Sequence, residues 1–251
     1  HVFRTYDQSA LDAQYNNRAL VPDFADHMGR WTRDSESVRL RLPCRLDVSY
    51  GPAPLERLDL FPSSRKNTPL HIFIHGGYWR ALDKDSFSSL APAFVAAGVS
   101  YAALNYPLAP AVRMDAIVQS VRRAIQWCRD HAKDLDIDPR RISISGHSAG
   151  GHLVAMIAAT DWSTFDDPTG SASSAVTFGV SLSGLYDLEP IRLSYLNADL
   201  RLDHAETSRN SPVGISLKRM PPLVLAVGTL ESQEFLRQQR DFFKTRHQQG
   251  H

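Results

Sequence analysis

The sequence has few cysteines and almost no excess charge. Cys44 and Cys128 are the two cysteines among 251 residues, and neither lies in a metal-binding or redox spacing such as Cys-x-x-Cys. We therefore expect both to be reduced. The formal net charge of +1 gives no indication of nucleic acid or an anionic membrane surface as a partner.

Long hydrophobic runs and targeting patterns are also missing. No apolar run approaches the roughly 18 residues that a membrane helix needs, and no signal peptide is visible. A cytoplasmic protein without a membrane partner is therefore the expectation. The sequence also lacks the His-Glu-x-x-His pattern of a zinc site, so we expect no metal or other cofactor.

Apolar strands and amphipathic helices alternate through most of the chain. This alternation predicts one α/β domain over residues 1–251, with a mostly parallel central sheet and helices on both faces. The first two expected strands look paired around a Gly-Pro turn. The expected strands are 44–51, 56–62, 69–77, 99–107, 141–145, 175–184 and 221–228, and the expected helices are 9–18, 86–98, 111–135, 149–159 and 232–249.

Three segments are less regular. Residues 1–35 are polar with scattered aromatics, and after the helix at 9–18 we expect irregular backbone. The sequence leaves open whether this segment contributes to a lid or cap. Residues 160–174 and 185–220 show little periodicity. Ligands of open α/β sheets bind at the carboxyl ends of the strands, so we expect these two segments to lie over that edge.

A Gly-x-Ser-x-Gly motif at 146–150, GHSAG, stands between an expected strand and an expected helix. A serine on such a sharp turn adopts a strained backbone conformation and presents its hydroxyl above the sheet. The flanking residues must be small because strand and helix nearly touch there, and the helix N-terminus favours negative charge nearby. The motif in this context predicts that Ser148 is a nucleophile rather than part of an ordinary glycine-rich turn.

The segment HGGYW at 75–79 follows another expected strand directly. Glycines in this place allow backbone N–H groups to point into a cavity. The tetrahedral intermediate of acyl transfer needs two or three such donors for its oxygen. We assign this role to the N–H groups of Gly77, Tyr78 and Ala149, with Gly76 as a further candidate.

An acidic residue follows a later strand. Glu231 lies in the loop between the strand at 221–228 and the last helix. A carboxylate there can orient a histidine and stabilise its charged form, and the chain order serine, acid, histidine is that of α/β-hydrolases. The residues alone allow equally that Glu231 is a helix N-terminal acid favourable to the dipole. Glu234 and Asp187 are weaker rivals.

Several of these segments together resemble a known family. HGGYW, GHSAGGH, LNYPLAP, VGTLESQEFLRQQ and the N-terminal LDAQYNNRALVPD are similar to the kynurenine formamidase branch of the α/β-hydrolase superfamily, close to the hormone-sensitive-lipase-like esterases. The resemblance runs over almost the whole chain. It implies an oxyanion hole from the loop motif, Ser148 as the nucleophile and Glu231 as the acid, although aspartate is frequent at that position in the family.

The resemblance also implies a catalytic histidine that follows the last helix and one further strand. Gly250-His251 comes directly after the last expected helix, and none of the ten histidines matches the family position. We therefore expect the last strand and the histidine loop of the fold to be missing from these residues, and the base to lie beyond His251. The alternative is that His251 serves as the base in an unusual geometry.

Together these residues predict a serine hydrolase that cleaves a small-molecule amide or ester through an acyl-enzyme. The resemblance implies arylformamides such as N-formylkynurenine, with carboxylesterase activity on small esters nearly as well supported. The aromatics Tyr78, Trp79, Tyr106 and Tyr186 line the substrate pocket or pack in the core, and the sequence leaves both open.

Two other classes of function remain as alternatives. One is a non-catalytic ligand-binding protein on a hydrolase scaffold. The other is a metal-dependent amidohydrolase, which is disfavoured because His71 and His75 share a strand face where packed or hydrogen-bonded histidines are expected. A homodimer is also left open.

Overall fold

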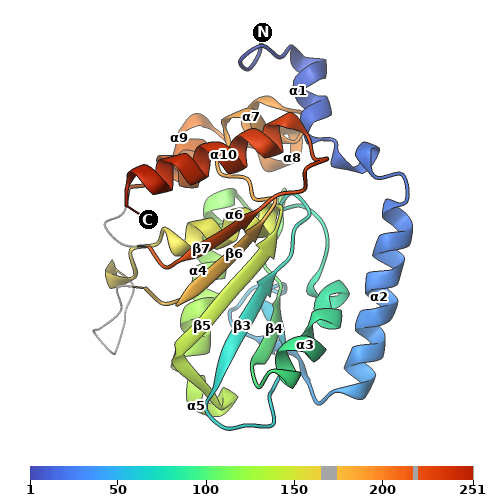
Figure 1. Ribbon diagram of the computed structural model, residues 1–251, viewed down its shortest axis with the longest axis vertical. Helices are drawn as coiled ribbons and strands as arrows, with labels where there is room; N and C mark the ends of the chain where they lie inside the picture. Colours follow the sequence, from blue (N-terminus) through green and yellow to red (C-terminus); the bar gives the residue numbers. More distant parts are fainter. Residues whose placement is uncertain (165–173, 217–219, 251) are drawn as a thin grey trace.

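Seven strands form one mostly parallel sheet in the computed structural model, which describes residues 1–164, 174–216 and 220–250 (Figure 1). Their order across the sheet is β1-β2-β4-β3-β5-β6-β7. The pairs β1–β2 and β2–β4 are antiparallel, and every later pair is parallel. The strands are β1 Arg45–Ser49, β2 Arg57–Phe61, β3 Thr68–Ile74, β4 Ser100–Leu104, β5 Ile137–His147, β6 Phe178–Leu182 and β7 Leu223–Ala226.

The connections between the parallel strands contain the helices, as the alternation in the sequence predicts. The α-helices of the described ranges are α1 Gln8–Tyr15, α2 Phe24–Arg41, α3 Ala91–Ala96, α4 Met114–Asp130, α5 Ala132–Leu135, α6 Ala149–Ala158, α7 Glu189–Leu193, α8 Asn197–Leu200, α9 His204–Arg209 and α10 Gln233–Gln248. Short 3₁₀-helices are η1 Asn17–Leu20, η2 Lys84–Leu90, η3 Trp162–Thr164 and η4 Pro212–Gly214.

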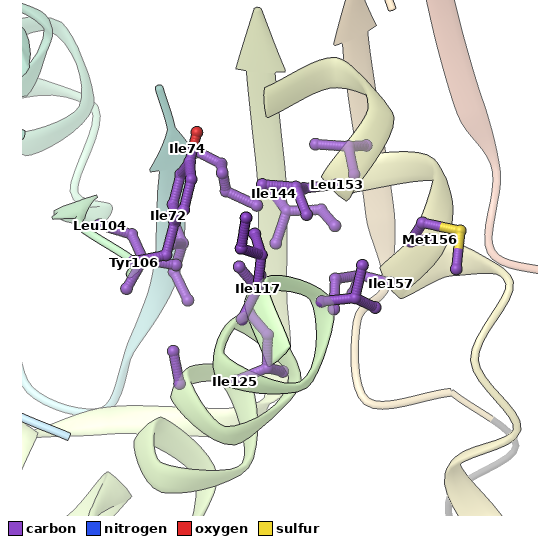
Figure 2. Close-up of a cluster of buried hydrophobic side chains, with 14 of the residues drawn as sticks. Ile72, Ile74, Leu104, Tyr106, Ile117, Ile125, Ile144, Leu153, Met156 and Ile157 are labelled. Atoms are coloured by element: carbon purple, nitrogen blue, oxygen red, sulfur yellow. The ribbon is translucent and has the colours of Figure 1, made fainter. Parts of the chain in front are cut away.

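The larger core lies between the sheet and helices α4 and α6. Figure 2 shows Ile72 and Ile144 of the central strands directed toward Ile117 of α4 and Leu153 of α6. All four side chains are fully buried. Strands covered on both faces are expected to be continuous apolar runs, which explains why β3 and β4 have no polar alternation.

The second face of the sheet is covered only in part by the described residues. Phe73, Tyr101 and Phe87 form a smaller core with α2, α3 and η2 over strands β2 to β4. On the same face, farther along the sheet, Phe178 of β6 is 37% exposed and Val224 of β7 is 47% exposed. Helix α10 packs against the opposite face, where Phe242 meets Ala155 of α6.

Helix α2 corrects one expectation. The sequence predicts irregular backbone after the first helix, whereas residues 24–41 form an 18-residue helix. Its apolar stripe is thin: only Ser35 and Val38 are buried, and Trp31 packs in part against Phe87 of η2. A helix held by so narrow a stripe carries a weak periodic signal, because most of its residues face solvent.

Short helices and loops gather at the carboxyl ends of the parallel strands. Figure 1 shows α1, α7, α8 and α9 above the tips of the strand arrows, with α10 crossing beside them. The expectation that residues 185–220 lie over this edge is confirmed for the part of that segment described here. Most of the other segment expected there, 160–174, lies outside the described residues. None of the helices in the described ranges combines the length and apolar character needed to cross a membrane.

Candidate active site

Ser148 occupies the sharp turn between β5 and α6. Its φ of 57° and ψ of −117° lie in a region that L-residues seldom adopt. The turn is tight: a Cβ on Gly146 would lie 2.4 Å from the carbonyl oxygen of Gly150, and one on Gly150 would lie 2.0 Å from that of Ile74. The glycines of the motif are therefore required by close backbone approach, and they allow Ser148 to stand at the helix N-terminus.

The loop after β3 lies directly against this serine. A Cβ added to Gly76 would be 3.2 Å from the Cβ of Ser148. The next three residues, Gly77, Tyr78 and Trp79, all have left-handed φ values, of 101°, 49° and 56°. This run of unusual conformations turns the backbone sharply beside Ser148.

Four backbone N–H groups around Ser148 are available as donors. Within the part of the chain that the structure describes, the amides of Gly76, Gly77, Tyr78 and Ala149 donate to no acceptor. Ala149 is the first residue of α6, so its amide has no partner within the helix. These are the four groups that the sequence predicts as the oxyanion hole.

Glu231 lies in the turn after β7, at the same edge of the sheet as Ser148. Its Oε1 accepts a hydrogen bond from the Gly228 amide at 2.9 Å and another from the hydroxyl of Ser183. Backbone bonds connect the strand ends, since the Ser148 amide donates to Leu182 at 2.8 Å. The Ser183 amide then donates to Ala226 of β7 at 2.7 Å.

Ser183 is the residue of this site that sequence reasoning missed. It follows β6, has a φ of 51°, and is 8% exposed. Its only sequence signal is its place after a strand that neighbours β5, followed by a glycine. The bonds from Ser183 and Gly228 leave Oε2 of Glu231 as the oxygen that can face an imidazole.

The two rival carboxylates are engaged elsewhere. The Arg237 guanidinium contacts Glu234 at 2.8 Å and Asp187 at 3.1 Å. Glu234 also accepts from the Tyr15 hydroxyl at 3.1 Å and is 2% exposed. In the described ranges Glu231, by contrast, makes no ion pair, which suits a carboxylate that serves a histidine.

No imidazole completes this arrangement among the described residues: none is hydrogen-bonded to Ser148 or to Glu231. His147 lies closest in sequence; desolvation lowers the pKa of its ring and the charge of Glu231 opposes that shift. His247 is on the exposed end of α10, stacked on Phe243. His251, the alternative base, lies outside the described residues.

The histidines near the loop have structural partners. The Trp79 indole donates to Nδ1 of His152 at 3.1 Å, which fixes the proton of that ring on Nε2, where it meets the Asn210 carbonyl at 2.8 Å. Burial lowers the pKa of His152 to about 4, although the bond to Asn210 opposes the shift. Nδ1 of His75 lies 2.8 Å from the Gly76 carbonyl, which is consistent with the expected bracing of the loop.

The aromatic residues predicted at the pocket are differently placed. Trp79, Tyr106 and Tyr186 are each 0% exposed, and the two phenols bond to the His75 carbonyl and to Ser181, both at 2.8 Å. These three side chains present no surface to a substrate in this structure. Tyr78 is half-buried, beside the N-terminal helix. The described residues include no group of three or more His, Cys, Asp or Glu side chains placed to bind a metal.

Known proteins share this arrangement of chain and sheet. Kynurenine formamidase of Danio rerio is 33% identical, over 96% of this chain and 84% of the fish protein. Esterase LipQ of Mycobacterium tuberculosis is 34% identical over 57% of this chain and 35% of LipQ. A crystal structure from Silicibacter sp. TM1040, described as that of a candidate thioesterase, matches with a TM-score of 0.83 at 33% identity, over 94% of this chain and 86% of that one.

The BD-FAE family model matches residues 58–233, which include the loop after β3, the serine turn and Glu231. The relatives support a hydrolase of the esterase or arylformamidase type. The chain belongs to the BD-FAE family, in the α/β-hydrolase branch of kynurenine formamidases and related esterases.

Proposed function

We propose that the protein is a serine hydrolase that cleaves a small amide or ester through an acyl-enzyme. One observation carries the proposal: a serine on a strained turn lies against a loop whose amides are free to donate. An alkoxide oxygen that develops next to Ser148 would meet N–H groups from two elements, the loop after β3 and helix α6. Such donors stabilise the transition state of acyl transfer more than the ground state.

The proposed chemistry has two halves. Ser148 Oγ attacks the carbonyl carbon, a base takes its proton, and the oxygen becomes an oxyanion held by the amides of Gly76, Gly77, Tyr78 and Ala149. Collapse of the intermediate expels the amine or alcohol, which receives the proton, and leaves the acyl group on Ser148. Water then attacks the acyl-enzyme with the same base and releases the acid.

Glu231 is proposed to orient the base. Ser183 and Gly228 hold one of its oxygens, so the other can accept from an imidazole and stabilise its charged form. We propose that this imidazole belongs to none of the histidines in the described ranges. The support is that no histidine of the described ranges bonds to either Ser148 or Glu231.

The proposed substrates are arylformamides of the N-formylkynurenine type, with small carboxylic esters as the second class. The first class is supported by the Danio rerio kynurenine formamidase and the second by the LipQ esterase. The ratio of kcat/KM for N-formylkynurenine to that for p-nitrophenyl acetate distinguishes the two.

Intact mass before and after treatment with a fluorophosphonate tests the mechanism. We expect one adduct on the wild-type protein and none on Ser148→Ala. A protein that takes no adduct would contradict the hydrolase and favour a ligand-binding protein on the same scaffold.

A further inference from the structure

The last residue of α1, Tyr15, is bonded to the loop after β3 and to two other parts of the chain. Its carbonyl oxygen accepts from the hydroxyl of Tyr78 at 2.8 Å and from the hydroxyl of Tyr195 at 3.3 Å. Its own hydroxyl accepts from the Gln238 side chain at 3.1 Å and donates to Glu234. Tyr15 is 0% exposed, so these bonds are shielded from water.

Tyr78 needs external support because of its backbone. It stands between Gly77 and Trp79 in a run of left-handed φ values, and a non-glycine residue in that region is strained. Such a conformation persists only when surrounding contacts hold it. Two side-chain bonds do so here: the Tyr78 hydroxyl to Tyr15, and the Trp79 indole to His152.

Helix α1 is also bonded to helix α10, which follows Glu231 in the chain. Helix α10 begins at Gln233, two residues after the acid. The Glu234 amide donates to the Gln14 side chain at 3.2 Å, and Oε1 of Gln238 accepts from the Asp187 amide at 2.9 Å. Helix α1 is therefore bonded both to the loop that carries the amide donors and to the start of α10.

We propose that the Tyr78 hydroxyl is a positioning group, through which α1 holds the loop after β3 in the conformation that directs its amides toward Ser148. The inference rests on the proposed function and extends it to the N-terminal segment. One proposed oxyanion donor is the backbone amide of Tyr78 itself. Removing the Tyr78 hydroxyl should therefore loosen that amide directly.

The consequence for catalysis is specific. Oxyanion donors act mainly in the transition state, so loosening the loop should lower kcat and leave KM nearly unchanged. Deleting a whole donor costs about 10²- to 10³-fold in kcat. Loosening one donor should cost less, and we expect roughly a tenfold loss.

Tyr78→Phe tests the proposal, with Tyr195→Phe as its matched control. Both variants remove a hydroxyl that donates to the same carbonyl oxygen, but only Tyr78 belongs to the loop. With p-nitrophenyl acetate as substrate, Tyr78→Phe should lose about tenfold in kcat with KM within about twofold, while Tyr195→Phe keeps the wild-type kcat. Equal kcat in wild type and Tyr78→Phe, or equal loss in both variants, would overturn the proposal.

Hydrogen exchange gives a second readout that does not depend on turnover. The amides of Arg80 and Ala109, which donate to the Gly77 and Trp79 carbonyls at 3.1 and 2.9 Å, should exchange faster in Tyr78→Phe than in wild type, and at the wild-type rate in Tyr195→Phe. Unchanged exchange in Tyr78→Phe contradicts the positioning role. Failure of the wild-type protein to react with the fluorophosphonate contradicts the proposed function instead, so the two failures are distinguishable.

Discussion

The sharp turn between β5 and α6 constrains the backbone of a single residue, Ser148. Its positive φ is imposed by the crossing of β5 and α6, where Gly146 and Gly150 leave no room for another path. Strain of this kind amounts to about 1–3 kcal/mol for a residue with a Cβ. Glycine adopts such conformations freely but costs about 0.5–1 kcal/mol in unfolded-state entropy.

The difference predicts the relative stability of two variants that lack the Ser148 hydroxyl. Ser148→Ala keeps the Cβ and its strain, whereas Ser148→Gly loses both, so the glycine variant should be more stable by about 1 kcal/mol. In a protein of this size that corresponds to roughly 2–4 °C in Tm. Thermal unfolding of the two variants measures the difference directly, and an alanine variant with the higher Tm would contradict the strain assigned to this turn.

The site residues that belong to a sequence motif can be predicted, whereas those outside any motif cannot. Ser148 and the amides of Gly77 and Tyr78 belong to short patterns whose spacing reflects backbone geometry. Ser183 carries no pattern, because its position is set by the pairing of β6 with β5 and β7. The sequence leaves the roles of Trp79 and Tyr106 open, because it does not say whether an aromatic side chain after a strand faces the core or a pocket.

At the scale of elements, the contact between β5, α6 and β3 depends on the absence of a side chain at 150. A Cβ there would lie 2.0 Å from one carbonyl oxygen and 2.7 Å from the next, both of rigid backbone at the end of β3. Gly150→Ala should therefore destabilise the fold by at least about 3 kcal/mol. Gly214→Ala is the control, because no atom lies within 4 Å of a Cβ at that position.

Denaturant unfolding of both alanine variants checks this prediction. The control should change the free energy of unfolding by less than about 0.5 kcal/mol. Similar midpoints for Gly150→Ala and wild type would mean that helix α6 can move away from β3, contrary to the close packing described.

The strands of the sheet can be predicted from the sequence because apolar runs and glycine-containing turns reflect the local backbone conformation. All seven expected strands are found, and the first two are antiparallel as the Gly-Pro turn indicates. The sequence does not predict helix α2, because this helix is held by its packing against η2, which is distant in sequence. Only a narrow apolar stripe of α2 takes part in that contact, so the helical periodicity is weak. The strand order also depends on long-range pairing, which periodicity does not specify.

At the scale of the whole molecule, buried neutral histidines make stability depend on pH. Burial lowers the pKa of both His71 and His152 to about 4, compared with about 6.5 in an unfolded chain. Between pH 6.5 and 4 the two histidines bind protons in the unfolded chain but stay neutral in the folded protein. The free energy of unfolding should therefore fall as the pH decreases from 6.5 toward 4.

Unfolding midpoints in urea at pH 7 and pH 5, at constant salt, measure this effect. Bonds from Arg140 lower the pKa of Asp138 to about 2, so its contribution is lost only below its unfolded value of about 3.9. Burial raises the pKa of Asp59, so this carboxyl opposes the effect of the histidines in part as the pH falls. Equal midpoints at the two pH values would contradict the burial of the two histidines.

The strained turn at Ser148 also has a consequence for how this protein can be improved. Selection for heat tolerance alone would reward glycine at position 148 and so eliminate the hydroxyl on which the proposed chemistry depends. Libraries screened only for folded protein after heating would therefore enrich variants with glycine at position 148. Libraries sorted by turnover would retain the serine. A directed-evolution experiment on this fold should impose both criteria in the same round.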